Sequence, residues 1–242
     1  EKREKIMREY VSLDLETTGL EPKNDRIIEI GAVKIKDGRV QETYSLLVDP
    51  QMKIPERITE LTGISNDMVA GKPFAEEAVS GLLEFCGELP LLGHNLRFDY
   101  GFVKHSAVNM GLVFEKRGMD TLKIARAVLP DLESRSLQSL RQYYHIPQEE
   151  AHRALEDALT TFHLYEKLRE EFEEDHPELF APKELIYKVK RQGPATPAQK
   201  RYLQDLVKYH RINLDVKLES LTKNEASRLI DRILGTYGRI VR

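Results

Sequence analysis

Hydrophobic and polar residues alternate along the first 175 residues in two periods, one typical of strands and one typical of helices. Period-two alternation or short apolar runs predict strands at 10–15, 27–36, 39–48 and 89–93. Asp37-Gly38 separates the second and third strands and is a strong signal for a hairpin turn. The run at 89–93 is apolar throughout, as expected of a central strand that is buried on both faces.

Helical spacing of apolar residues appears between and after these strands. It predicts helices at 74–86, 98–110, 121–129, 137–144 and 154–172. A hairpin of strands, followed by strands alternating with helices, predicts an α/β fold in which a mixed sheet is flanked by helices.

The pattern breaks after residue 175, where an acidic run is followed by Pro177, Pro182 and Gly193-Pro194. A pair of amphipathic helices follows. Each begins with a capping-box signature, Thr196-Pro-Ala-Gln199 and Thr222-Lys-Asn-Glu225, and Gly235 is the predicted stop of the second helix. We therefore expect one domain at 1–175, a linker at 176–194 and a small helical module at 195–242.

Charge divides the chain in the same way. The 242 residues carry a net charge of −3, but residues 1–182 sum to −11 and residues 183–242 to +8. Such a split indicates segments with different partners, or segments that attract each other. No apolar run approaches the roughly 20 residues of a membrane span, so we expect no membrane partner. The single cysteine, Cys86, cannot form an internal disulfide, which favours a reducing, cytoplasmic location. Because the sequence begins with Glu1 rather than Met, the lack of a signal peptide carries little weight.

Four carboxylates carry the candidate chemistry. Asp14 and Glu16 lie two apart on a predicted strand and so point to one face, opposite Val11, Leu13 and Leu15. Asp99 follows the predicted buried strand, and Asp157 opens the last long helix. If the four converge, two charges about 5 Å apart repel by roughly 3 kcal/mol even at an effective dielectric near 20. Only cations make such a cluster tolerable, and hard oxygen ligands select Mg²⁺ or Mn²⁺.

Each of these residues has an ordinary alternative when taken alone. Asp14 and Glu16 could be a solvated pair, Asp99 could stabilise a helix start, and Asp157 could be a surface residue. His152, five residues before Asp157, could be a structural or exposed histidine. The joint arrangement favours a metal site, because a turn follows the first pair and the other carboxylates each follow a distinct motif.

Those motifs resemble a known family. Asp14-x-Glu-Thr-Thr-Gly19, His94-Asn-x-x-Phe-Asp99 and His152-x-x-x-x-Asp157 are similar to the pattern of the DnaQ-like 3′-to-5′ exonucleases. The match covers about residues 8–172 and includes Leu61-Thr-Gly-Ile64 and Asp120-Thr121. It indicates the DEDDh subgroup, which has a histidine five residues before the last aspartate. That subgroup includes proofreading subunits of DNA polymerases and oligoribonuclease-type enzymes.

The resemblance implies a ribonuclease-H-like fold and hydrolysis with two Mg²⁺ or Mn²⁺ ions. Asp14 would bridge both ions, Glu16 and Asp157 would complete one site, and Asp99 would act directly or through water. His152 is the implied general base. Five residues on a regular helix rotate by about 140°, so His152 and Asp157 could not share a helix face. We therefore expect His152 on the loop before the helix.

Substrate contacts are also implied by the resemblance. Thr17 and Thr18 after the first strand would hold the 3′-terminal nucleotide, together with His94, Asn95 and Phe98. Its base or sugar would pack against Leu61, Thr62 and Ile64. Core packing is the alternative interpretation for Phe98 and Leu61.

The sequence thus predicts a metal-dependent 3′-to-5′ exonuclease that releases nucleoside monophosphates from single-stranded or frayed DNA ends. One alternative is preference for RNA or short oligoribonucleotides, which depends on how the pocket treats the 2′-hydroxyl. Another is a non-catalytic binding or scaffold subunit. A DNA polymerase or other replication or repair protein is a candidate partner.

The basic module has two interpretations that the sequence leaves open. It could dock on the acidic domain or on a protein partner. It could also clamp nucleic acid through cations that meet phosphates; these are Arg191, Lys200, Arg201, Lys208, Arg211 and Lys217.

Overall fold

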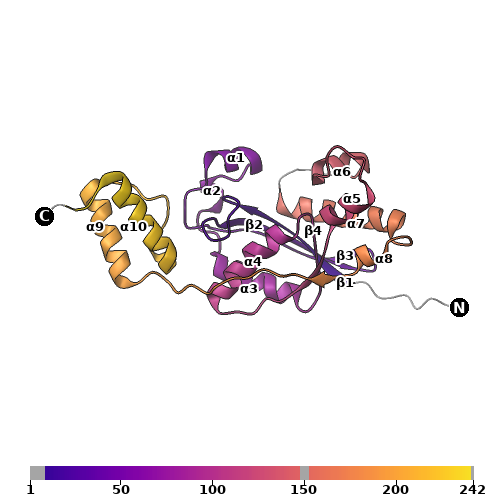
Figure 1. Ribbon diagram of the computed structural model, residues 1–242, viewed down its shortest axis with the longest axis horizontal. Coiled ribbons are helices and arrows are strands. Elements are labelled where there is room, and N and C mark those ends of the chain that lie inside the picture. The colour runs from indigo at the N-terminus through magenta and orange to yellow at the C-terminus, as the bar shows by residue number, and fades with distance from the viewer. Residues whose placement is uncertain (1–8, 148–152, 241–242) are drawn as a thin grey trace.

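The computed structural model describes residues 9–147 and 153–240, and a six-stranded mixed sheet lies at its centre (Figure 1). The strand order is β3-β2-β1-β4-β5-β6. β1, β2 and β3 are antiparallel, β4 and β5 continue the sheet parallel to β1, and β6 returns antiparallel. The strands span Glu9–Thr17, Ile27–Lys36, Arg39–Leu47, Leu91–Gly93, Arg117–Asp120 and Lys183–Glu184.

Helices cover both faces of the sheet. α3 (Ala75–Cys86) and α4 (Arg97–Met110) pack on one face, in a core that includes Val11, Leu13 and Leu15. The opposite face is covered by α5, α6 and α7, in a second core that includes Tyr10. These three helices span Thr121–Val128, Leu137–Tyr143 and Ala154–Phe172. The predicted alternation along β1 is therefore confirmed: its odd-numbered apolar residues face one core.

The structure also contains short elements that the apolar pattern did not predict. They are α1 (Glu56–Thr62), α2 (Asn66–Val69), β5, α8 (Pro177–Phe180) and β6. The longest of these has 7 residues, too few to establish a hydrophobic period. The expected strand at 89–93 is shorter, beginning at Leu91.

The C-terminal helices form with both predicted capping boxes. Thr196 caps the start of α9 (Pro197–His210), and Thr222 caps the start of α10 (Lys223–Tyr237). The predicted stop at Gly235 is wrong. α10 continues to Tyr237, and Gly238 ends it with a φ of 84°, a conformation that glycine adopts without steric cost. A separate small core holds the pair together, including Leu203, Leu206 and Ile233.

Residues 176–194, expected to be a linker, lie along the first domain. Phe180 is buried and packs on Tyr165 of α7. β6 pairs with β5. The backbone N–H of Gln192 donates to the Asn109 side chain of α4, at 3.1 Å. The path of the chain towards α9 is thus fixed by contacts over most of this segment.

Within the described part of the chain, no helix is long and apolar enough to cross a membrane.

Candidate active site

The end of β1 lies directly against the first turn of α7. Asp14 pairs with Gly31 of β2, and a Cβ atom placed on Gly31 would lie 2.1 Å from the carbonyl carbon of Ala154. Only a glycine leaves room there for the helix. The Ser12 hydroxyl donates to the Ala158 carbonyl oxygen at 2.7 Å, one turn further along α7. This packing brings Asp157 over the strand that carries Asp14 and Glu16.

Three of the predicted carboxylates meet at this contact. Asp14, Glu16 and Asp157 each offer an oxygen, and these oxygens lie within 4.8 Å of one another. Burial, followed by the charge of Asp157 and then that of Glu29, raises the pKa of Glu16 to about 8. Burial also raises the pKa of Asp14 well above its usual range, and the charges of Asp99 and Asp157 add to it. The cluster therefore holds more negative charge than its surroundings neutralise.

Asp99 reaches the same region from α4 but does not belong to that three-carboxylate group. It is buried, and its Oδ1 accepts a hydrogen bond from the Leu15 backbone N–H at 3.1 Å. Among the neighbouring charges, that of Asp99 raises the pKa of Asp14 the most. The structure thus brings Asp99 against β1, with one oxygen hydrogen-bonded to the backbone between Asp14 and Glu16.

Glu29 and Arg153 support the site and were not predicted. Glu29 pairs with Glu16 across β1 and β2 and is 2% exposed. The Arg153 guanidinium donates to both carboxylate oxygens of Glu29, and the Ala154 N–H donates to Oε2 at 3.0 Å. Glu29 therefore anchors the start of the helix that carries Asp157. The available signal was a carboxylate in the apolar run Ile27-Ile-Glu-Ile30, since unpaired buried carboxylates are rare.

The predicted general base, His152, lies outside the described residues, so its role stays a prediction. α7 begins at Ala154.

Among the candidate substrate contacts, Leu61, Asn95 and Phe98 have surface available. Leu61 on α1 is 54% exposed, although it is apolar. Asn95 is exposed and adopts a φ of 65°, while Phe98 is half-buried against Phe102. Such side chains could contact a nucleotide without disturbing the core.

The other candidates are engaged within the protein. Ile64 is fully buried in a small core with Ile28, and the Thr62 hydroxyl donates to the Ile58 carbonyl. The His94 ring nitrogens contact the Thr121 hydroxyl at 2.9 Å and the Arg135 carbonyl at 3.0 Å. A substrate hydrogen bond from this ring would require one of those contacts to break.

Thr17 and Thr18 stabilise the turn after β1. The Thr17 hydroxyl donates to the Gly19 carbonyl at 2.7 Å. The Thr18 hydroxyl accepts from the Arg26 N–H at 2.9 Å, and the Thr18 N–H donates to the Arg26 carbonyl at 2.8 Å. These contacts shape the chain beside the carboxylates.

The donor set fits a divalent metal. It consists of half-buried carboxylates that repel each other and that supply hard oxygen ligands. A six-stranded mixed sheet, with helices on both faces and such a cluster on its central strand, defines the class of nucleases with a ribonuclease-H-like fold.

Comparison with known proteins gives the family. The family model described as "Exonuclease" matches residues 11–165, and the chain therefore belongs to the exonuclease family. It is 37% identical over 163 residues to DNA polymerase III subunit epsilon of Aquifex aeolicus, which covers 67% of this chain and 81% of that protein. A structure of Exonuclease X with 5′ overhanging duplex DNA is 26% identical, with a TM-score of 0.54, covering 67% of this chain and 92% of that one.

A longer relative matches the same region. The chain is 43% identical over 169 residues to DNA polymerase III PolC-type of Clostridium perfringens. The match covers 68% of this chain but only 12% of that protein.

Proposed function

We propose that the protein is a DEDDh-type 3′-to-5′ exonuclease that uses two Mg²⁺ or Mn²⁺ ions and releases nucleoside monophosphates. The observation that supports this proposal best is the convergence of Asp14, Glu16 and Asp157 within 4.8 Å, with Asp99 against the same strand. Asp14, Glu16, Asp99 and Asp157 would hold the metals. Bound ions would lower the pKa of the attacking water and stabilise charge on the leaving oxygen.

The protein's own residues perform the remaining steps. His152 takes a proton from the attacking water as its oxygen bonds to the terminal phosphorus. The bond from phosphorus to the 3′ oxygen of the preceding nucleotide breaks, and that oxygen takes a proton from a water molecule and becomes the new 3′ hydroxyl. Glu29 and Arg153 keep Asp157 in place. Leu61 and Phe98 position the terminal nucleotide by apolar contact, which suits an enzyme without base preference.

The substrate in this proposal is single-stranded DNA or a frayed 3′ end. Three relatives support it. The Exonuclease X structure holds duplex DNA with a 5′ overhang, and the identities to an epsilon subunit and a PolC-type protein connect the chain with DNA polymerase III. A replicative or repair polymerase is the proposed partner. The proposed location is cytoplasmic, consistent with a single, buried free cysteine.

Matched 5′-labelled DNA and RNA oligonucleotides test the proposal. With Mn²⁺, shortening of the DNA from its 3′ end, one nucleotide at a time and faster than the RNA, is the expected result. Faster shortening of the RNA would show that RNA, and not DNA, is the preferred substrate. No hydrolysis of either strand by a metal-supplemented preparation would contradict the activity.

A further inference from the structure

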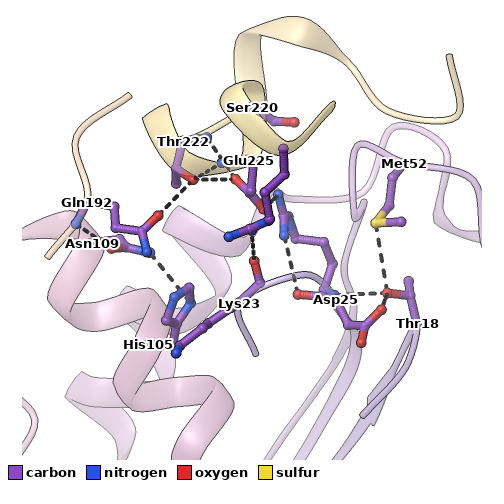
Figure 2. Close-up of polar contacts among 12 residues, drawn as sticks. Thr18, Lys23, Asp25, Met52, His105, Asn109, Gln192, Ser220, Thr222 and Glu225 are labelled. Carbon is purple, nitrogen blue, oxygen red and sulfur yellow. Dashed lines mark hydrogen bonds and ion pairs between the residues drawn. The ribbon is translucent and has the colours of Figure 1, made fainter. Parts of the chain in front are cut away.

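An ion pair holds the C-terminal module on the exonuclease domain. Arg26, beside the turn after β1, contacts Glu225 of α10 at 2.5 Å, with side-chain exposures of 17% and 9%. Figure 2 shows Glu225 of α10 next to the loop that carries Lys23 and Asp25, and Thr222, just before α10, contacting Gln192. Glu225 also closes the capping box of α10 with Thr222. The helix is therefore fixed to the domain at its first turn.

A backbone contact makes a second attachment. Met52 and Val216 form an antiparallel bridge, supported by hydrogen bonds from the Lys53 N–H to the Asp215 carbonyl at 2.5 Å and from the Lys217 N–H to the Gln51 carbonyl at 2.8 Å. The chain continues from here into α1, which carries the exposed Leu61. The module is thus fixed relative to a candidate substrate contact.

A cleft of about 890 Å³ lies between the two parts. One wall is formed by residues 52–56 with Thr59, and the other includes Arg232 and Tyr237 of α10. In Figure 1 this side of the module lies next to α1 and α2. Its cations are Lys53 and Arg232.

A second cavity, of about 670 Å³, lies on α9. It is lined by Tyr202, Lys208, Tyr209 and Arg239, among others. Three rings connect the two cavities: the centroid of His210 lies 4.8 Å from that of Tyr209 and 5.6 Å from that of Tyr237. Tyr237 lines the cleft and Tyr209 lines the second cavity, so a row of contacting rings links the two linings. We call the cleft, this row and the second cavity the track.

The track has the chemistry of a single-strand binding surface. Tyr202, Tyr209 and Tyr237 are 36%, 48% and 53% exposed, and exposed rings beside cations bind bases by stacking and phosphates by charge. Glu56, Asp205 and Asp215 also line these cavities and would repel phosphates. We therefore expect the phosphates at the four cations and the bases at the rings. The cations are Lys53, Lys208, Arg232 and Arg239. The net charge of +8 on residues 183–242 favours a negatively charged ligand over a neutral protein surface, and the exposed rings favour a strand with bases.

We propose that the cleft beside α1, the Tyr209–His210–Tyr237 row and the cavity on α9 together bind the single strand upstream of its 3′ end. This inference rests on the proposed function, because it assumes that the end occupies the carboxylate site. Of the six cations expected to form a clamp, Lys208 lines this track. Lys217 instead pairs with Asp49 at 3.6 Å, and the Arg191 guanidinium lies against Gly111, which follows α4.

Binding without hydrolysis tests the track. Fluorescence anisotropy with 5′-labelled dT20, rU20 and dT4, in EDTA, measures affinity of the full chain while turnover is blocked. The double variant Tyr209→Ala/Tyr237→Ala should bind the 20-mers at least about thirtyfold more weakly, as expected for the loss of two base stacks. Lys208→Ala/Arg232→Ala should also weaken binding and should lower the slope of log affinity against log salt by about 1.4, since two phosphate contacts are lost. Binding of dT4 should change little.

Matched variants separate the track from general effects. Tyr209→Phe/Tyr237→Phe keeps the rings and should bind like the wild type. Lys188→Ala/Lys190→Ala removes the same charge elsewhere; Lys188 lines a different cavity, with Lys104, and this variant should also bind normally. Circular dichroism checks that each variant is folded.

Three results would overturn the track: unchanged 20-mer affinity in both test variants, an equal loss in Lys188→Ala/Lys190→Ala, or an equal loss with phenylalanine. The first result would leave this surface to a protein partner. Failure of the proposed function would look different, because the wild-type protein with Mn²⁺ would then leave dT4 intact whatever the binding data show.

Discussion

Two places in this molecule join segments that are distant in the sequence, and they do so with opposite electrostatics. At the end of β1, Asp14, Glu16 and Asp157 bring like charges together. At the junction of α10 with the first domain, Arg26 and Glu225 bring opposite charges together. Both contacts are partly buried, so both sets of groups lose some of their contact with water.

The oppositely charged pair stabilises the fold. The like-charged carboxylates destabilise it and stay together only because other contacts hold them. The junction compensates its own desolvation by pairing. The carboxylates have no such compensation. Burial and mutual repulsion therefore raise the pKa values of Asp14 and Glu16. Their geometry depends on neighbours such as Glu29, which is paired with Arg153. Unfavourable repulsion that neighbouring residues hold in place is typical of functional sites.

The largest effect is expected at Asp14. Asp14→Ala should abolish turnover, because it removes a ligand from the centre of the cluster, and should keep the fold, because it also removes repulsion. Exonuclease assays with 5′-labelled DNA and circular dichroism measure the two effects. An unfolded variant would mean that Asp14 stabilises the structure, which contradicts the contrast between the two places.

His152→Ala should lower the turnover rate by about 10²–10⁴, the usual contribution of a general base. Metal affinity, measured by calorimetry with Mn²⁺, should stay near the wild-type value because the carboxylates are intact. An unchanged rate would remove His152 from the mechanism.

Glu29→Gln should lower the rate by about 10–100-fold, in the range found for groups that orient metal ligands. The change weakens the bonds to Arg153 and Ala154 that hold the start of α7. Glu42→Gln is the matched control, since Glu42 pairs with Lys34 at a site where its side chain is 62% exposed. Equal losses in the two variants would show that the effect is general rather than positional.

Without metal, stability should fall as pH rises from about 4.5 to about 8. Glu16 has a pKa of about 8 in the folded protein against 4.5 for its usual value, so between these values the folded state binds more protons than the unfolded state. Stability then decreases with increasing pH. Thermal melts in EDTA at pH 5 and pH 8 measure the change. Glu16→Gln should flatten it, because it removes the group whose pKa is raised, and Mn²⁺ should raise the Tm at pH 8; a pH-independent Tm would contradict the repulsive cluster.

The sequence was sufficient for the parts that depend on period and local signals. The strand at 27–36 and the helix at 154–172 have the expected bounds, and both C-terminal capping boxes form. These features depend on neighbours a few residues apart, which a sequence displays directly.

The sequence was insufficient where distant residues decide the outcome. Glu29 is paired with a residue 124 positions away, and Phe180, in a segment read as a linker, packs on α7. His94 and Ile64 also make internal contacts that their motifs did not indicate, and their role at the substrate stays a prediction. A motif gives the residue type at a position, but it does not say which partners already occupy its atoms.

The smallest expected effect is at the junction. Glu225→Gln keeps a residue that can complete the capping box but removes the charge that pairs with Arg26, so it should destabilise the module by about 1 kcal/mol. Hydrogen exchange of α10 measures this loss, and Glu219→Gln, at an exposed position, is the control. Turnover of dT4 should remain unchanged, because the ion pair contributes to docking and not to the carboxylate site. A rate loss as large as that of Glu29→Gln would mean that the Arg26–Glu225 pair also shapes the carboxylate end of β1. The effect would pass through the backbone pairing of Thr18 with Arg26. The two places would then not be separable into one that stabilises the fold and one that carries the carboxylates.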